Sequence, residues 1–362
     1  MSQNGSVAVI GGGAWGTALA NAVAGRHPVT LWLRDPEAAA RIERGRENAR
    51  YLPGVPLHPG IRATADAGAL AAAGTVLLVT PAQTARAVIG QLKSHLPPGA
   101  PVVLCAKGIE RGTDAFMSAV AAEALPVGTP VAVLSGPSFA ADVARNLPTA
   151  VTLAAAEAGL AADLAHRLSG PTLRLYHTDD VRGVEIGGAG KNVLAIACGI
   201  VAGSGLGESA RAALIARAFA ELMRFARLYG GRPETLMGLS GLGDLVLTAS
   251  SPQSRNFAFG ERLGAGATPE AAAGGKLAEG AFTAAALVAL ARAQGLEMPI
   301  AEAVADIVAG AARVDAVVAR RMARPRHGEV EEAPVRASLR RCGPLYAVRA
   351  EGEPLSAGDG RR

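Results

Sequence analysis

Two lysines stand where a side chain could take part in proton transfer. Lys107 follows a short apolar run, and Lys191 lies between a glycine cluster and an apolar run that begins at Val193. An ammonium group can donate a proton to a carbonyl oxygen as that oxygen gains charge, and burial or a second cation would lower its pKa toward the working range. From these residues alone, Lys191 is equally well explained as a helix-start lysine that reaches water, and Lys107 is better explained as a surface lysine.

Four further residues have the chemistry to bind a phosphorylated, hydroxylated small molecule. Ser254, Arg255 and Asn256 place a hydroxyl, a forked guanidinium and an amide on successive residues. A guanidinium can bind two phosphate oxygens at once. Asp244 ends a Gly-Leu-Gly-Asp segment, where its carboxylate could accept a substrate hydroxyl or orient a lysine. Taken alone, Asp244 is better explained as a residue that closes a loop between helices.

A glycine cluster near the start of the chain matches the dinucleotide-binding pattern G-x-G-x-x-G. Gly11, Gly13 and Gly16 lie between a β-branched run and an Ala-rich stretch, as a strand, turn and helix would require. The first glycine permits the tight turn, the second lets the backbone approach a pyrophosphate, and the third lets the helix pack closely. The alternative is a glycine-rich turn with no ligand.

The second expected strand ends in Arg34 and Asp35, which bear on the choice of cofactor. An acid at this place usually binds the ribose 2′-hydroxyl of NAD, whereas an arginine can bind the 2′-phosphate of NADP. The sequence permits either cofactor, and because Arg34 comes first we favour NADP. A solvated charge pair at the end of a strand is the other explanation.

The order of apolar segments predicts a doubly wound α/β domain followed by a helical one. Short apolar strands alternate with Ala-rich helices in the first half, which is typical of a parallel sheet covered on both faces. The expected strands are 7–10, 29–33, 76–80, 102–106 and 131–134, with a first helix at 17–24. The second half gives helices at 193–201, 212–228, 283–293 and 300–312. We therefore expect a Rossmann-type domain in residues 1–185, a helical substrate domain in 186–324, and a flexible tail in 325–362.

Composition excludes several classes of protein. The net charge of +5 over 362 residues comes with no dense Lys/Arg block, which argues against a nucleic-acid partner. The three cysteines and six histidines are scattered, so we expect neither disulfides nor a metal site. The N-terminus lacks a basic stretch before an apolar one, and no apolar run reaches the roughly 18 residues that a membrane span needs. A cytoplasmic protein without an integral membrane segment is the expectation.

The combination of these motifs is more specific than any one of them. In this order, the segments around Gly11, Lys107, Gly136, Lys191 and Asp244, followed by the Ser-Arg-Asn triplet, closely resemble the bacterial NAD(P)-dependent glycerol-3-phosphate dehydrogenase family. The resemblance extends over about residues 5 to 315. It implies a hydride transfer that interconverts dihydroxyacetone phosphate and sn-glycerol 3-phosphate, in a role that supplies phospholipid synthesis. A homodimer through the helical domain is compatible with the sequence.

The resemblance also assigns roles to individual residues. It makes Lys191 the proton donor and acceptor. Expected substrate contacts are Lys107, Gly136, Ser138, Asp244, Ser254, Arg255 and Asn256. Expected cofactor contacts are Gly11, Gly13, Ala14, Trp15, Gly16, Arg34, Lys107, Ala140, Arg255, Leu277 and Glu279. Without the resemblance, the segment around Gly136 and Ser138 is simply a turn. Ala14 and Trp15 depart from the serine and smaller aromatic that many members carry, so a hydroxyl contact at residue 14 is lost.

Two other functions fit parts of the same pattern. A β-hydroxyacid dehydrogenase acting on a carboxylate also uses a lysine on the first helix after its dinucleotide domain. The phosphate-binding triplet at Arg255, together with Lys107, distinguishes the present sequence from that class. A non-catalytic NAD(P)-binding redox sensor would need only the glycine loop, so the presence of Lys107, Lys191 and Asp244 argues against it.

Overall fold

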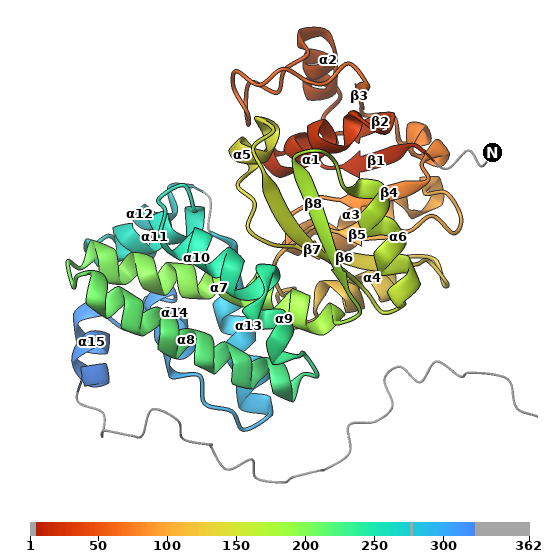
Figure 1. Ribbon diagram of the computed structural model, residues 1–362. Helices are drawn as coiled ribbons and strands as arrows, with labels where there is room; N and C mark the ends of the chain where they lie inside the picture. The colour runs from red at the N-terminus through yellow and green to blue at the C-terminus, as the bar shows by residue number, and fades with distance from the viewer. Residues whose placement is uncertain (1–4, 276–277, 323–362) are drawn as a thin grey trace, which may run out of the picture. The chain divides into compact units, whose positions relative to one another are not determined.

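An eight-stranded sheet organises the first half of the chain in the computed structural model, which describes residues 5–275 and 278–322 (Figure 1). The strands lie in the order β3-β2-β1-β4-β5-β6-β7-β8. Their bounds are Val7–Ile10, Val29–Trp32, Ile61–Thr64, Thr75–Leu78, Val102–Leu104, Val131–Ser135, Thr149–Ala155 and Leu173–Thr178 for β1 to β8. All neighbouring pairs are parallel except β6 and β7.

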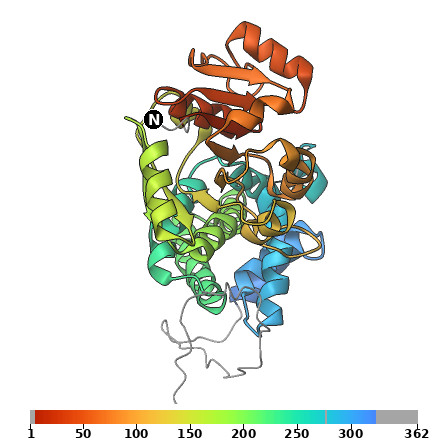
Figure 2. The same cartoon turned by 90° about the vertical axis from the view of Figure 1, so that its right-hand side faces the viewer.

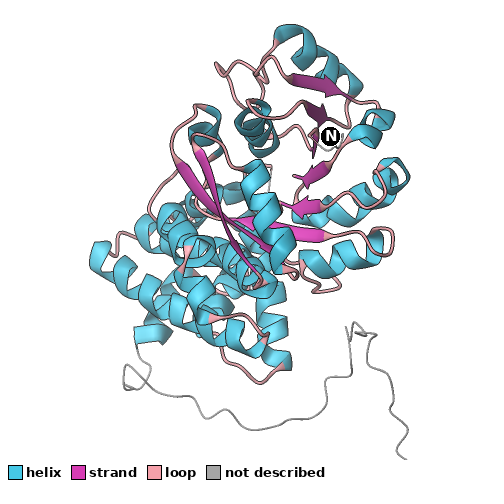
Figure 3. Ribbon diagram, turned by 45° about the vertical axis from the view of Figure 1, so that its right-hand side comes forward, coloured by secondary structure: helices cyan, strands magenta, loops and turns pink. Residues whose placement is uncertain are grey.

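Helices cover both faces of this sheet (Figure 3). Alternate residues of a strand point to opposite faces, so Val7 and Val9 of β1 enter one apolar cluster, whereas Ala8 and Ile10 enter another. The covering helices include α1 (Ala14–Ala24), α2 (Pro36–Gly45), α3 (Ala85–Leu92), α4 (Met117–Ala124) and α6 (Ala158–Leu168), while the short helix α5 (Ala140–Ala144) follows β6. The doubly wound α/β class predicted from the sequence is therefore confirmed.

Two expectations about the sheet were wrong. The sequence did not reveal β3, β7 and β8, because their polar and small residues give only a weak apolar run. The pairing of β7 with β6 is antiparallel, whereas a parallel sheet was expected. The connection between these two strands contains only the five-residue helix α5, which packs beside α1 and does not cross a face of the sheet. A parallel return needs such a crossover.

The second half is built from helices around the long helix α7, Val181–Gly203. Figure 2 shows the green and blue helices of this half gathered mostly below the red and orange segments of the first. After α7 come α8 (Glu208–Leu228), α9 (Pro233–Met237), the π-helical turn η4 (Leu239–Gly243), α10 (Asp244–Ala249), α11 (Arg255–Gly264), α12 (Pro269–Ala273), α13 (Glu279–Ala293), α14 (Pro299–Val308) and α15 (Val314–Met322). The all-helical character of this half agrees with the prediction.

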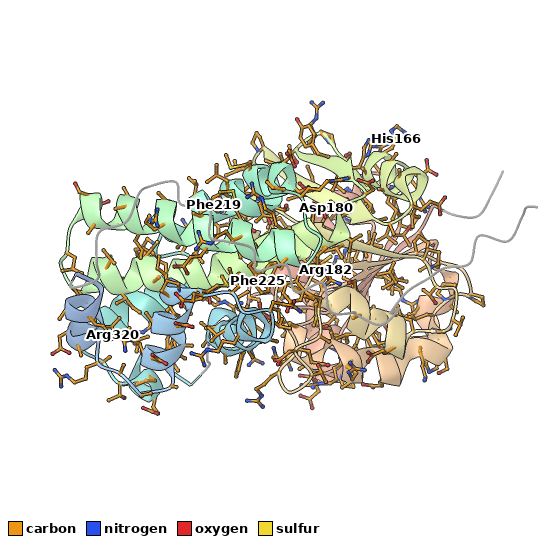
Figure 4. All side chains as sticks on the ribbon, turned by 90° about the horizontal axis from the view of Figure 1, so that it is seen from below. His166, Asp180, Arg182, Phe219, Phe225 and Arg320 are labelled. Carbon is orange, nitrogen blue, oxygen red and sulfur yellow. The ribbon has the colours of Figure 1, made fainter. Side chains whose placement is uncertain are left out.

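Helix α7 begins at Val181, well before the predicted start near residue 193. Asp180, labelled in Figure 4, caps it. Its carboxylate accepts from the backbone N–H of Gly183 at 2.8 Å and from that of Arg232 at 2.8 Å. The glycines that precede the expected start lie inside this helix and allow close packing. An added Cβ would lie 2.7 Å from the Ser240 carbonyl oxygen at Gly187 and 2.4 Å from Leu222 at Gly190.

Helices α7 and α11 touch backbone to backbone through glycines on both sides. An added Cβ would lie 2.1 Å from the Phe257 oxygen at Gly199 and 2.0 Å from the Glu261 oxygen at Gly203. In return, Gly260 and Gly264 of α11 sit against carbonyl oxygens of α7, at 2.1 Å and 2.2 Å from an added Cβ. Such contact leaves no room for a side chain, so it fixes where α11 begins relative to α7.

Among the described residues, α7 is one helix long and apolar enough to cross a bilayer by length and composition. However, 83% of its most apolar window is buried inside the protein. The sequence showed no uninterrupted run of that length because Arg182, Glu185 and Lys191 divide the segment. Packing in the core of the helical half accounts for the apolar character of α7.

The glycine contact between α7 and α11 predicts a large loss of stability in Gly199→Ala. We expect the free energy of unfolding to fall by about 1–3 kcal/mol, because the added methyl group must push two backbones apart. Urea and thermal unfolding of the purified protein measure the change. The matched control is Gly90→Ala, in the interior of α3, where nothing lies within 4 Å of an added Cβ. There the same substitution should be neutral or stabilising, and equal effects at the two positions would contradict the packing argument.

Candidate active site

A buried carboxylate shared by two lysines forms the centre of the candidate site. Asp244, the first residue of α10, is 1% exposed. Its Oδ2 accepts from Lys107 Nζ at 2.6 Å, and its Oδ1 accepts from Lys191 Nζ at 3.0 Å. Lys107 follows β5, and Lys191 lies in the middle of α7. The structure therefore brings together three residues that the sequence singled out separately.

The neighbours of this cluster hold the two ammonium groups in place. Lys191 Nζ also donates to Thr248 Oγ1 at 2.9 Å, and Lys107 Nζ donates to the carbonyl oxygen of Gly136 at 2.9 Å. Thr248 lies one helical turn after Asp244, and its hydroxyl donates in turn to the backbone oxygen of Asp244. Two alternative explanations that the sequence left open do not hold: Lys191 lies inside a helix and is buried, and Asp244 begins a helix instead of closing a loop.

Burial and charge together set the protonation of the cluster. Lys191 is 8% exposed, and burial lowers its pKa to about 8. The positive charge of Lys107 acts in the same direction, whereas Asp244 opposes both. Burial alone would raise the pKa of Asp244, but the two lysines hold it below its usual value. Lys191 can thus exchange a proton near neutral pH while Asp244 stays ionised.

The end of β6 presents backbone and hydroxyl groups beside Lys107. Gly136 has φ +150° and would place a Cβ 2.8 Å from the backbone of Val151, so only glycine fits. Its carbonyl oxygen accepts from Ser138 Oγ at 2.9 Å as well as from Lys107. Ala140, the first residue of α5, packs in an apolar cluster that also contains Ala14 and Trp15 of α1. This segment therefore reaches from the lysine cluster to the glycine loop.

The start of α11 brings a third group of polar residues to α7. Ser254 caps this helix, since its Oγ accepts from the N–H of Phe257 at 3.3 Å, and Arg255 is its first residue. Asn256 Nδ2 donates to Asn192 Oδ1 at 2.9 Å, and its Oδ1 accepts from the N–H of Gly280 at 2.9 Å. Asn192 directly follows Lys191. The Ser254–Asn256 segment, which the sequence predicted to bind phosphate, is therefore hydrogen-bonded to the neighbour of Lys191.

Helix α13 adds an acidic side chain that joins the two halves of the chain. Glu279, its first residue, accepts from the backbone N–H of Ala82 at 3.2 Å, just after β4. Burial raises the pKa of Glu279, while Arg255 and both lysines act to lower it. Leu277, the other cofactor contact expected in this segment, lies outside the described residues.

The glycine loop has the shape that a pyrophosphate requires. Gly11 has φ +120°, and an added Cβ there would lie 2.5 Å from the carbonyl oxygen of Val79. An added Cβ at Gly16 would lie 1.8 Å from the carbonyl oxygen of Gly11. Nothing lies within 4 Å of an added Cβ at Gly13, which caps α1 without a side chain. Among the described residues, the buried Thr80 Oγ1 has no hydrogen-bond partner. These features fit a bound dinucleotide.

A cavity of about 720 Å³ adjoins this loop, and the two residues expected to contact the cofactor ribose, Arg34 and Asp35, line it. Asp35 is occupied as the cap of α2: it accepts from the N–H groups of Glu37 and Ala38 at 2.9 and 3.2 Å. Arg34 is exposed and lines the cavity. Other lining residues include Gly11, Gly12, Gly13, Arg41, Asn48, Arg50, Tyr51 and Thr80.

Sequence reasoning missed three polar residues of the site. Thr248 could have been found, because residues four apart share a face of a helix and Asp244 was already a candidate. Asn192 adjoins Lys191 but carries no signal of its own. Asn48, which donates to Gly12 and Thr17, lies in a segment between α2 and β3 that has no recognisable motif.

Comparison with known proteins places this site in a family. Residues 6–161 match the model of the NAD-dependent glycerol-3-phosphate dehydrogenase N-terminus, and residues 180–319 match that of its C-terminus. The chain is 75% identical over 332 residues to a Methylobacterium radiotolerans protein named glycerol-3-phosphate dehydrogenase (NAD(P)+), covering 91% of this chain and 100% of that one. A relative of the same name from Azorhizobium caulinodans is 60% identical, with the same coverage.

The solved structures agree. The crystal structure of glycerol-3-phosphate dehydrogenase from Coxiella burnetii superposes with a TM-score of 0.84 at 38% identity, over 89% of this chain and 100% of that one. With both family models matched in order and the lysine cluster in place, the chain belongs to the NAD-dependent glycerol-3-phosphate dehydrogenase family.

Proposed function

We propose that this chain is an NAD(P)-dependent oxidoreductase that interconverts dihydroxyacetone phosphate and sn-glycerol 3-phosphate. The observation that carries the proposal is the buried Asp244 carboxylate, which accepts from both Lys107 and Lys191, in a chain of this family. Strands β1, β4 and β5 are parallel neighbours, so the glycine loop after β1 and Lys107 after β5 lie at the same edge of the sheet. Ligands of open α/β sheets bind at this edge.

The residues of the cluster divide the work of proton transfer. A bound NAD(P)H would supply the hydride that the carbonyl carbon of the substrate accepts. Lys191, as an ammonium, donates a proton to the carbonyl oxygen, which completes the alcohol; in the reverse direction, neutral Lys191 accepts that proton. Asp244 and Thr248 orient its Nζ. Lys107 places a second positive charge where the oxygen gains negative charge.

Arg255 and its neighbours are proposed to bind the phosphate end of the substrate. Arg255 opens α11, whose N-terminal N–H groups favour an anion, and a guanidinium can bind two phosphate oxygens. The bonds from Asn256 to Asn192 and Gly280 hold this helix start against α7 and α13. This anion site at α11 favours a phosphorylated substrate over the simple carboxylate of a β-hydroxyacid dehydrogenase. A redox sensor would not need Asp244 and Lys191 to be buried at the cost of their hydration.

We also propose a preference for NADP, a location in the cytoplasm, and a homodimer formed through the helical half. The cofactor preference rests on Arg34, since Asp35 already caps α2 and lies 4.0 Å from Arg41. The product, sn-glycerol 3-phosphate, would supply the backbone for phospholipid synthesis. The location and the dimer stay predictions.

Replacing the proposed proton donor should abolish turnover without loss of cofactor binding. For Lys191→Ala we expect kcat for dihydroxyacetone phosphate reduction to fall by about 10²–10⁴-fold, the usual contribution of a general acid. The rate is followed by the absorbance of NADPH, and NADPH binding is titrated separately. Lys93→Ala, at an exposed lysine remote in sequence from the site, is the control and should keep full activity. Near-normal turnover in a folded Lys191→Ala protein would refute the assignment.

The lowered pKa of Lys191 predicts opposite pH profiles for the two directions. Reduction needs the ammonium form, so its kcat/KM should decline as the pH rises through about 8. Oxidation of sn-glycerol 3-phosphate needs the neutral form, so its kcat/KM should increase over the same range. Lys107→Met removes a charge that lowers this pKa and should move both limbs to higher pH, whereas Asp244→Asn should move them lower. If the pH dependence of kcat/KM is the same in both variants as in the wild type, a group other than Lys191 titrates in this range.

Arg34 should set the cofactor preference. We expect Arg34→Ala to weaken the use of NADPH by about tenfold in kcat/KM while NADH changes little, because only NADPH carries the 2′-phosphate. Initial rates with each cofactor at saturating dihydroxyacetone phosphate measure the ratio. Arg44→Ala, on the exposed last turn of α2, removes the same charge without altering the cavity lining, and the ratio should not change. An equal loss with both cofactors in Arg34→Ala would contradict a role at the 2′-phosphate.

A further inference from the structure

The glycine loop depends on a residue that the dinucleotide motif does not contain. Asn48 lies after α2, is 2% exposed, and directs its side-chain amide toward the start of α1. Its Nδ2 donates to the carbonyl oxygen of Gly12 at 2.9 Å and to Thr17 Oγ1 at 2.7 Å. Asn48 also lines the cavity next to the loop. One buried amide thus joins the middle of the motif to the first turn of its helix.

The orientation of the Gly12–Gly13 peptide follows from this bond. In a planar trans peptide, the C=O and the following N–H point in opposite directions. A Gly12 carbonyl held by Asn48 therefore turns the N–H of Gly13 to the other side. No carbonyl of the described residues accepts a backbone bond from this N–H, and the space beside Gly13 is open. Leu33 fills the space beside Gly12, where an added Cβ would lie 2.3 Å from its side chain.

The segment that carries Asn48 is itself firmly built. The backbone oxygen of Asn48 accepts from the N–H groups of Tyr51 and Leu52 at 3.0 and 2.8 Å. Leu52 and Val55 pack in an apolar cluster with α1 and α5. A second asparagine, Asn21 of α1, binds the far end of the segment: its Nδ2 donates to the Pro56 oxygen at 3.1 Å, and its Oδ1 accepts from the His58 N–H at 3.0 Å.

We propose that Asn48 is a positioning residue that aims the Gly13 N–H at the pyrophosphate of the cofactor. The proposal rests on the NAD(P)-dependent function proposed above and extends it to a residue outside the glycine motif. Glycines are free to rotate, so a loop of three successive glycines needs an outside contact to hold one peptide orientation. The Asn48 amide supplies this contact, and the bond to Thr17 fixes the amide relative to α1.

Direct cofactor binding, measured without substrate, tests the proposal. In Asn48→Leu, which keeps a similar volume but has no donor, we expect the Kd for NADPH to rise by about tenfold, as for the loss of one or two hydrogen bonds to an anion site. ADP-ribose, which contains the pyrophosphate, should lose affinity by the same factor. Adenosine 2′-phosphate, which lacks the pyrophosphate, should keep its affinity. Titration of protein fluorescence or calorimetry gives each Kd.

The matched control is Asn21→Leu, which loosens the same segment from α1 without touching the glycine loop. It should lower the thermal midpoint but leave all three Kd values unchanged. An unchanged Kd for NADPH in Asn48→Leu, an equal rise in Asn21→Leu, or a parallel loss of adenosine 2′-phosphate would each overturn the positioning role. If Asn48→Leu does not fold, Asn48→Ala removes the donor without adding a charge and carries the same test. Wild-type protein that binds neither NADPH nor NADH would instead refute the proposed function.

Discussion

The site depends on one buried carboxylate that must be neutralised from two sides. Removing Asp244 from water costs several kcal/mol, and the cost is recovered only if its partners stand at hydrogen-bonding distance. Lys107 and Lys191 meet this requirement at 2.6 and 3.0 Å, yet they come from a sheet edge and from a helix interior. The fold must therefore hold β5, α7 and α10 in fixed relation before any chemistry can take place.

Helix α7 holds these elements together, because its glycines allow neighbouring segments to pack closely against it. Each glycine in a helix interior lowers helix stability by about 1 kcal/mol relative to alanine. In α7 this loss is offset because the missing side chains let neighbouring segments pack close to the helix. Gly187 contacts the turn that precedes Asp244, Gly188 contacts Ser135 at the end of β6, and Gly199 contacts α11. The same helix thus touches every element that delivers a polar residue to Lys191.

The sequence was sufficient where the chemistry is local. The order of strand, glycine loop and helix at Gly11–Gly16 depends on neighbouring residues, and it was predicted with its ends nearly right. The lysine cluster is different, since Lys191 and Asp244 lie 53 residues apart and no period connects them. Only the resemblance to a known family predicted that Lys191 and Asp244 belong to the same active site. The interior position of Lys191 was missed because glycine propensity, a local rule, is overridden by contacts with distant segments.

The start of helix α2 shows how an N-cap can decide between two adjacent candidate residues, Arg34 and Asp35. The sequence permitted either Arg34 or Asp35 to contact the ribose, and it favoured Arg34 only because Arg34 comes first in the chain. The structure assigns the Asp35 carboxylate to the first N–H groups of α2, where a negative charge also favours the helix dipole. Both residues line the cavity, but the N-cap bonds of α2 already use the Asp35 carboxylate, whereas the Arg34 guanidinium has no such role there.

The charge balance of the cluster connects substrate binding to proton transfer. Burial keeps the pKa of Lys191 low; the charge of Lys107 acts in the same direction, whereas Asp244 opposes both. In the proposed complex, a phosphorylated substrate would bring negative charge close to the cluster, which favours the ammonium form of Lys191. In the direction of reduction, the arriving substrate thus increases the population of the form that donates the proton. A lysine whose pKa lies near the working pH can respond in this way, whereas a solvated lysine, already fully protonated, cannot.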